Sequence, residues 1–165
     1  IGATAGWLGQ SSWLASVGGR EDGAPPPVDL AVERRNGEFV RSLIVTGRAT
    51  AVHDLSEGGL AIGLAEMAIA GATGAQIEAL PTGPIHASLF GEDQARYVLT
   101  CLAGDTAAIL GEAATAGVPA MRLGATSGDA LRLPGEEPIL VAKLRDAYED
   151  ALPTYMAGEC PEAFK

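Results

Sequence analysis

The clearest hydrophobic pattern lies between residues 50 and 71. An apolar, partly β-branched run at 50–53 predicts a short strand, and the polar and glycine residues at 54–59 predict a turn. Leucine, methionine and alanine then recur at helical spacing, which predicts a helix from about Leu60 to Ala70. We therefore expect a strand–turn–helix unit around which the other elements are arranged.

Similar patterns predict further elements on both sides of this unit. A short helix with Trp7, Leu8 and Trp13 on its apolar side is expected near the start, and a short helical turn within 84–93. Longer helices are expected at 30–45 (N-cap Asp29), 106–116 (N-cap Asp105) and 140–158, the last broken at Pro153. Strands are expected at 75–79, 96–102, 118–123 and 130–133, with 124–129 as the turn between the last two.

The order of these elements predicts an α+β fold. Strands alternate with helices, and the consecutive strands near the end imply antiparallel pairing, so we expect a layered α/β/α domain with a mixed sheet of about four to six strands. Residues 1–165 are interpreted as a single module. Its leading segment, 1–20, follows a truncated strand, and its tail, 159–165, is expected to be frayed.

The predicted turn at 54–59 carries the residues of an anion site. The first amides of a helix lack intrahelical partners and carry partial positive charge, and Gly58 and Gly59 would let a phosphate approach them closely. Ser56 stands where a helix cap is expected, and Asp54 could hold Mg²⁺ against a nucleotide phosphate. Ordinary turn and capping chemistry selects the same residue types, so both interpretations stand at this point.

Composition and charge exclude several classes of function. The formal net charge is −10, which argues against nucleic-acid or anionic-membrane partners because these need clustered Lys and Arg. No apolar run reaches the length of a membrane span, and no signal peptide is recognisable at the start. Cys101 and Cys160 stand far apart, outside any metal-binding pattern, which favours a reducing, cytoplasmic setting.

Two other polar positions have simple structural interpretations. Glu92 and Arg96 flank the turn into the strand at 96–102 and are expected to form an ordinary ion pair. His86 has no second His or Cys at metal-ligand spacing, so we expect a half-buried or capping histidine rather than a ligand.

The stretch AVHDLSEGGLAIGLAEMA, residues 51–68, resembles the C-terminal module of the phosphoribosylformylglycinamidine synthase family. GATAGWLGQSSWL at 2–14, PIHASLFGEDQARYVLTC at 84–101 and AKLRDAYEDALPTYMAG at 142–158 are also similar, so the resemblance spans nearly the whole chain. The wider superfamily includes aminoimidazole ribonucleotide synthetase, whose C-terminal fold the resemblance implies here. It also includes selenophosphate synthetase, a hydrogenase maturation protein and thiamine-monophosphate kinase.

The resemblance implies a ligase of purine biosynthesis that uses ATP and Mg²⁺ to convert formylglycinamide ribonucleotide and ammonia into formylglycinamidine ribonucleotide. It implies that Asp54 binds the metal and that His53, Ser56, Gly58 and Gly59 form part of a nucleotide or phosphate site, with no catalytic residue assigned. The implied partners are the N-terminal modules of the same polypeptide, a glutaminase that supplies ammonia, and the small-molecule substrate.

The sequence also departs from a complete enzyme of this kind. It contains neither a GxxxxGK[ST] loop nor a glutaminase Cys/His/Glu set, so we expect the last portion of a longer polypeptide, inactive in isolation. Two alternatives remain: a non-catalytic module for packing and interaction, and the C-terminal module of another superfamily member.

Overall fold

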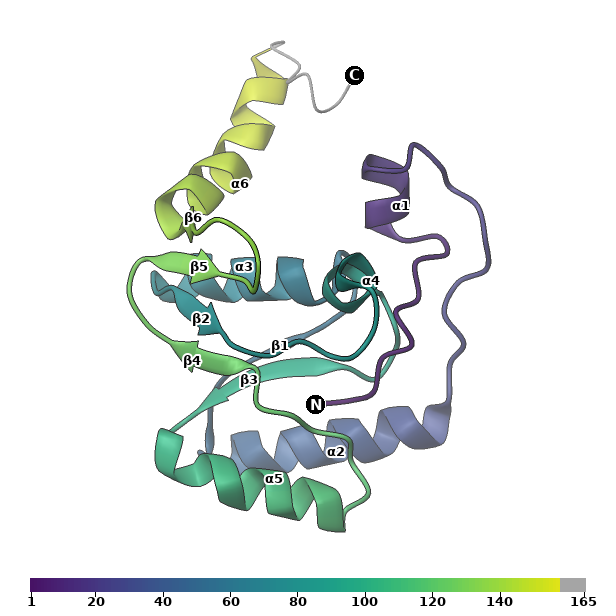
Figure 1. Ribbon diagram of the computed structural model, residues 1–165, viewed down its shortest axis with the longest axis vertical. Helices are drawn as coiled ribbons and strands as arrows, with labels where there is room; N and C mark the ends of the chain where they lie inside the picture. The colour runs from purple at the N-terminus through teal and green to yellow at the C-terminus, as the bar shows by residue number, and fades with distance from the viewer. Residues whose placement is uncertain (158–165) are drawn as a thin grey trace.

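The computed structural model describes residues 1–157, which form six α-helices and six β-strands (Figure 1). The helices are α1 (Ser12–Ser16), α2 (Leu30–Val45), α3 (Gly59–Gly71), α4 (Ile85–Phe90), α5 (Thr106–Thr115) and α6 (Val141–Met156). The strands are β1 (Ala49–Asp54), β2 (Ala75–Ile77), β3 (Tyr97–Cys101), β4 (Gly124–Thr126), β5 (Ala130–Arg132) and β6 (Ile139–Leu140), and a 3₁₀ turn, η1 (Ala103–Asp105), precedes α5.

The strands of the described residues form two sheets. β1 and β3 pair antiparallel, with Val52 opposite Leu99 and Asp54 opposite Tyr97. The second sheet has the order β4-β2-β5-β6, in which β2 and β5 are parallel and the other pairs antiparallel. The expected mixed sheet of an α+β fold is therefore confirmed, although the strands are divided between two sheets.

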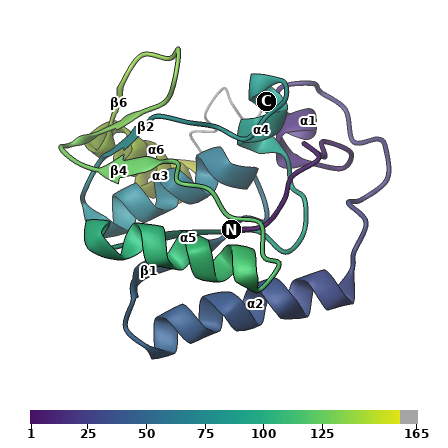
Figure 2. The same cartoon turned by 60° about the horizontal axis from the view of Figure 1, so that its bottom comes forward.

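Helices cover both faces of the β1–β3 pair. Figures 1 and 2 show α3 on one side of this pair and α2 and α5 on the other. The core lies beneath α3, where apolar side chains of the helix meet those of both sheets. Its buried members are Leu55, Leu60, Leu64, Ile77, Val98 and Leu131.

Local sequence signals predicted α2 correctly. Asp29 caps the helix by accepting hydrogen bonds from the amides of Ala31 and Val32, and Gly47 follows the helix in a left-handed conformation. Inside the helix, Asn36 is fully buried and its amide nitrogen donates to the Ala95 carbonyl at 2.9 Å. This bond ties α2 to the segment that leads into β3.

The C-terminal half corrects several expectations. β4 lies at 124–126, in the predicted turn, because Gly124 lets the backbone of Gln76 approach so closely that a Cβ would meet its carbonyl oxygen at 1.9 Å. The strand expected at 118–123 does not form, because pairing with β2 begins only at Gly124, and the two-residue β6 was not predicted. Pro153 does not break α6, and Asp105 is the N-cap residue of α5 but makes no side-chain capping bond.

The N-terminal region corrects another expectation. The first helix contains only Ser12–Ser16, so Trp7 and Leu8 precede it in an extended loop. Trp13 instead stacks on His86, with ring centroids 5.3 Å apart, and on Phe90 at 6.4 Å. His86 is thus an exposed stacking partner. The predicted frayed tail at 159–165 lies outside the described residues.

Within residues 1–157, no helix combines the length and apolarity needed to cross a bilayer.

Candidate ligand-binding turn between β1 and α3

Glycines shape the turn between β1 and α3. Gly58 and Gly59 have φ angles of 74° and 62°, which disfavour residues with a Cβ. A Cβ on Gly59 would lie 2.6 Å from the Gly91 carbonyl oxygen, so the start of α3 packs directly against the backbone that follows α4. Gly59 is therefore required by this close backbone contact, and Gly58 by its left-handed backbone and by the Ile62 side chain beside it, whether or not a ligand binds.

Both glycine amides have partners within the chain. The Gly58 amide donates to Oε1 of Glu92 at 2.8 Å, and the Gly59 amide donates to the Ser56 carbonyl at 3.1 Å. The expectation that these amides are free for an anion is wrong, because Glu92 already supplies a negative charge at the helix start. Ser56 is exposed and does not cap α3, whose N-cap is Gly58.

Glu92 connects two helix starts. The same Oε1 atom accepts a hydrogen bond from the Ser12 amide, in the first turn of α1, at 2.9 Å. On the neighbouring side, the Ser12 hydroxyl donates to Glu57 at 3.1 Å. One carboxylate therefore holds the leading segment of the chain against the turn.

Asp93 holds the same leading segment at a second place. Its carboxylate accepts bonds from the Thr4 hydroxyl and from the amides of Ala5, Gly6 and Trp7, at 2.5 to 3.3 Å. Successive amides that converge in this way form an anion-binding concavity. Burial raises the pKa of Asp93, but these hydrogen bonds and the charge of Arg96 outweigh it, so the net pKa is lowered.

Arg96 pairs with Asp93 rather than with Glu92. Its guanidinium nitrogen Nη1 lies 3.9 Å from Oδ2 of Asp93 and donates to the Gly91 carbonyl at 2.9 Å. Arg96 is only 4% exposed, and burial lowers its pKa. The predicted Glu92–Arg96 ion pair is therefore wrong, because the Glu92 carboxylate turns toward the amides of Ser12 and Gly58.

His53 and Asp54 lie at the other side of the turn. Nε2 of His53 is 2.9 Å from a carboxylate oxygen of Glu66 on α3, and Nδ1 contacts the Asp54 carbonyl. Both partners are acceptors, so both contacts are hydrogen bonds only when both ring nitrogens carry protons. The Asp54 side chain is 65% exposed, and its Oδ1 is 3.9 Å from Nδ1 of His53.

The turn fits the expected Mg²⁺ and ATP only in part. The exposed Asp54 carboxylate suits Mg²⁺, which takes one or two protein carboxylates and completes its shell with phosphate and water oxygens. Residues 1–157 contain no cluster of three or more His, Cys, Asp or Glu side chains that could hold a metal by themselves. The amides expected to receive a phosphate are occupied by Glu92 and Ser56. Among the described residues, the turn thus presents the exposed Asp54 carboxylate, but its two glycine amides are not free to receive a phosphate.

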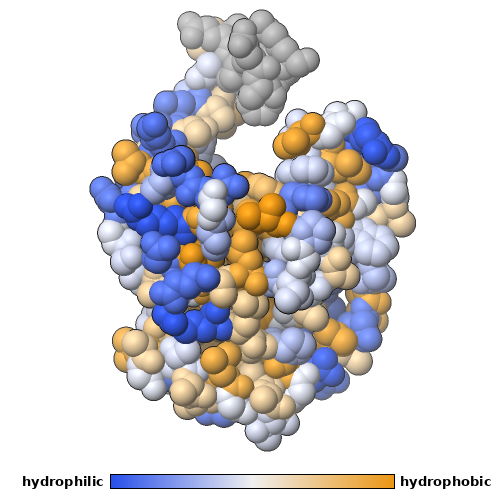
Figure 3. All heavy atoms as spheres, viewed as in Figure 1, coloured by the Kyte–Doolittle hydropathy of each residue, from blue (hydrophilic) through white to orange (hydrophobic). Residues whose placement is uncertain are grey.

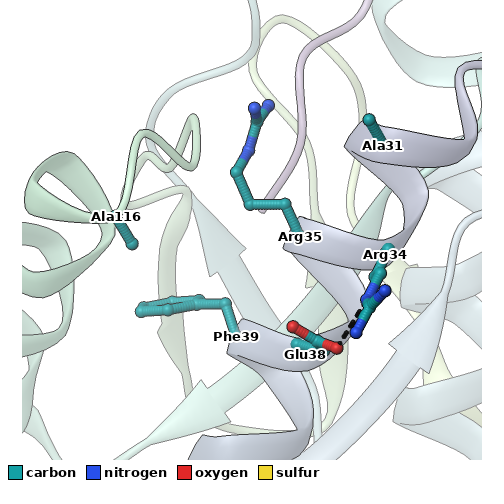
Figure 4. A pocket seen from close by; sticks show the side chains of 6 residues that line it. All are labelled: Ala31, Arg34, Arg35, Glu38, Phe39 and Ala116. Atoms are coloured by element: carbon teal, nitrogen blue, oxygen red, sulfur yellow. Dashed lines mark hydrogen bonds and ion pairs between the residues drawn. The ribbon is translucent and has the colours of Figure 1, made fainter.

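Two cavities lie away from the turn. One, of about 410 Å³, is an open groove between α2 and the end of α5, where Arg34 pairs with Glu38 at 2.9 Å (Figure 4). In Figure 4, the Arg35 side chain points away from that pair. The other, of about 420 Å³, separates the two sheets. Neither cavity is lined by a residue of the turn.

Sequence reasoning missed the roles of Glu92 and Asp93. The available signal was two adjacent carboxylates directly after Gly91, at the end of a short helix. Which amides they would bind depended on the fold, since their partners stand more than 30 residues away in the chain.

Comparison with known proteins identifies close relatives. The chain is 53% identical over 159 residues to the phosphoribosylformylglycinamidine synthase subunit PurL of Azorhizobium caulinodans, and 55% identical over 158 residues to that of Methylocella silvestris. Each alignment covers 96% of this chain but only 22% of the relative, so the chain spans about a fifth of these proteins.

Solved structures show the same fold. Thermotoga maritima PurL complexed with FGAR matches with a TM-score of 0.70 at 17% identity, over 87% of this chain and 26% of that one. The PurLQS structure of the same organism matches with a TM-score of 0.65 at 16% identity, over 83% and 24%. The family described as AIR synthase related protein, C-terminal domain, matches residues 3–133. The chain therefore belongs to the AIR synthase related protein C-terminal domain family.

Proposed function

We propose that residues 1–165 form the C-terminal module of an ATP-dependent phosphoribosylformylglycinamidine synthase. The observation that carries this proposal is the 53% identity to PurL subunits over 96% of the chain. The activity would be the amidation of formylglycinamide ribonucleotide in purine biosynthesis. A PurL structure complexed with ATP is among the similar folds, which supports ATP as the nucleotide. The identity to PurL disfavours the other superfamily activities.

The module would act with partners that lie outside this chain. The N-terminal modules of the same polypeptide would complete the nucleotide and substrate sites, and a glutaminase would supply ammonia. The similarity to a structure named PurLQS supports a multi-subunit enzyme. Such an enzyme would work in the cytoplasm, where its phosphorylated substrates are made.

Within the module, we assign Asp54 as a Mg²⁺ ligand at the edge of the nucleotide site, with His53, Ser56, Gly58 and Gly59 as the surrounding turn. The exposure of Asp54 supports this assignment, because its side chain is 65% exposed at the end of β1 and can face another module. Bound Mg²⁺ would neutralise phosphate charge, and Asp54 would hold the ion in position.

The test is Mg²⁺-dependent ATP binding to the full polypeptide, measured by calorimetry. Asp54→Asn removes the metal ligand while keeping its shape, so the affinity for Mg·ATP should fall about tenfold or more, with little change in the absence of Mg²⁺. Asp146→Asn is the matched control, since Asp146 is an exposed carboxylate on α6. Equal affinities for the two folded variants would refute the assignment.

A second function, that of a structural module that binds no nucleotide, is favoured by a different observation. Glu92 already satisfies the Gly58 amide, so the glycine turn serves the internal packing of the module without any ligand. If Asp54→Asn leaves binding unchanged, this structural function is the one that remains.

A further inference from the structure

Glu66 connects α3 to the end of β1. Its Oε2 atom lies 2.9 Å from Nε2 of His53, within hydrogen-bonding distance of that ring nitrogen. The other ring nitrogen, Nδ1, contacts the Asp54 carbonyl and lies 3.9 Å from Oδ1 of the same residue. The His53 ring therefore stands between Glu66 and Asp54, with one nitrogen directed at each.

Gly63 leaves the space that this ring occupies. It is buried on α3 three residues before Glu66, and residues three apart on a helix are neighbours on one face. A Cβ on Gly63 would lie 3.6 Å from Nδ1 of His53 and 3.8 Å from the Asp54 carbonyl oxygen. One face of α3 thus provides room for the imidazole at Gly63 and a polar partner for it at Glu66.

The three side chains differ in exposure. Those of His53 and Glu66 are half-buried, at 30% and 40% exposure, whereas that of Asp54 is 65% exposed. Pairing with β3 holds the backbone at this place, with His53 opposite Val98 and Asp54 opposite Tyr97. The contacts of the His53 ring therefore act on the freedom that remains, which is the orientation of the Asp54 carbonyl and carboxylate.

We propose that Glu66 is a positioning residue for Asp54 and acts through His53. This inference rests on the proposed function of Asp54 as a Mg²⁺ ligand. Glu66 orients the imidazole, and the imidazole holds the end of β1 so that the Asp54 carboxylate faces the ion in one orientation. Loss of a residue that orients a metal ligand in this way typically lowers metal affinity by about 10–100-fold.

Calorimetry of Mg·ATP binding to the full polypeptide tests the proposal with Glu66→Ala. Without the oxygen beside Nε2 the ring is no longer held, so the affinity for Mg·ATP should fall by about tenfold or more, with little change in the absence of Mg²⁺. Glu38→Ala is the matched control, because Glu38 also lies 2.9 Å from a side-chain nitrogen, that of Arg34, but stands on α2. Equal affinities for Glu66→Ala and the control would overturn the proposal.

Glu66→Gln distinguishes positioning from a general effect of the substitution on the fold. Glutamine keeps an oxygen that can accept a hydrogen bond from Nε2 of His53, so this variant should recover most of the affinity that Glu66→Ala loses. Binding as weak as that of Glu66→Ala would refute positioning by this contact.

A double-mutant cycle with Asp54→Asn separates the inference from the proposed function. In the Asp54→Asn background, Glu66→Ala should cause no further loss of Mg·ATP affinity, because the ligand that it positions is already absent. Losses that add would show that Glu66 acts elsewhere, and would refute the inference while leaving the assignment of Asp54 intact. An Asp54→Asn variant that binds Mg·ATP like the wild type would instead refute the proposed function, and the inference with it.

Discussion

At the scale of single residues, carboxylates of the chain occupy anion-binding amides, among them the Gly58 amide that the sequence suggested for a ligand. Glu92 accepts the amides of Gly58 and Ser12, and Asp93 accepts the amides of Ala5, Gly6 and Trp7. Helix starts and converging amides attract any negative charge, and an internal carboxylate is always present at high effective concentration. These two residues therefore attach the leading segment to the rest of the domain.

Substitution of Glu92 should weaken this attachment. Glu92→Gln keeps the shape but loses the charge, and should lower the free energy of unfolding by about 1 kcal/mol, whereas Glu92→Ala leaves two amides unpaired and should cost about 1–3 kcal/mol. Urea unfolding followed by tryptophan fluorescence measures both, because Trp7 and Trp13 lie in the attached segment. Glu137→Gln, at an exposed position, is the control and should change little.

Asp93 should make stability depend on pH. Its pKa in the folded state is lower than the ordinary value of 3.8, so the ionised carboxylate stabilises the fold above that value. This contribution is lost as the pH falls through the lowered pKa. Asp93→Asn should therefore be about 2 kcal/mol less stable than the wild type at pH 7, and the difference should shrink below about pH 4.

Chemical denaturation at several pH values from about pH 2 to 7 would measure the difference in unfolding free energy between Asp93→Asn and the wild type. Asp146→Asn, whose carboxylate is exposed, should show no comparable convergence. A constant difference between Asp93→Asn and the wild type at every pH would contradict the interpretation.

At the scale of elements, α3 begins where it does because of a backbone contact. Gly59 lies against Leu89, Phe90 and Gly91, so the first turn of α3 and the end of α4 approach at a distance that no side chain allows. In the sequence the glycine pair suggested a phosphate site, but in the structure it allows α3 and α4 to pack closely together. The same glycines would serve a ligand only if Glu92 moved away from the Gly58 amide.

A pair of glycine substitutions tests this explanation. Gly59→Ala introduces a Cβ at positive φ and 2.6 Å from a carbonyl oxygen, and should destabilise the domain by more than about 1 kcal/mol. Gly111→Ala, in the interior of α5 with open space around it, should stabilise by about 0.5–1 kcal/mol. Thermal unfolding distinguishes them, and a neutral Gly59→Ala would show that the contact is not required.

At the scale of the whole molecule, α6 carries an apolar surface that nothing in the described residues covers. Figure 1 shows α6 extending away from the body, and Figure 3 shows a hollow between α6 and α1 with hydrophobic side chains at its floor. Four large side chains of this helix are between 64% and 78% exposed: Tyr148, Leu152, Tyr155 and Met156. An apolar surface of this kind is typical of an interface, which agrees with a module that packs against other modules.

The isolated chain should not catalyse the ligase reaction. Within residues 1–157, no cluster of three or more His, Cys, Asp or Glu side chains could hold a metal alone, and Glu92 occupies the Gly58 amide, so the remaining groups of the proposed site would have to come from other modules. A turnover assay with formylglycinamide ribonucleotide, ATP, Mg²⁺ and ammonia should give no product above background for the isolated chain. The full polypeptide is the positive control, and robust turnover by the isolated chain would contradict the proposed division of the site.

The sequence by itself determined the elements that depend on local signals. The β1–turn–α3 unit, α2 with its Asp29 cap and the strand at 97–101 follow from periodicity, capping residues and glycine, all of which act over a few residues. The motif in that unit also identified the family that the comparisons confirm.

Only the tertiary structure decided how the candidate site is filled and where the short strands lie. Glu92 reaches Gly58 across 34 residues, and Gly124 forms β4 because it fits against Gln76, not because of a strand-like sequence. Such contacts depend on which distant backbone groups remain without partners once the helices and longer strands have packed. No pattern along the chain contains that information, so the sequence predicted the turn while the fold determined its partners.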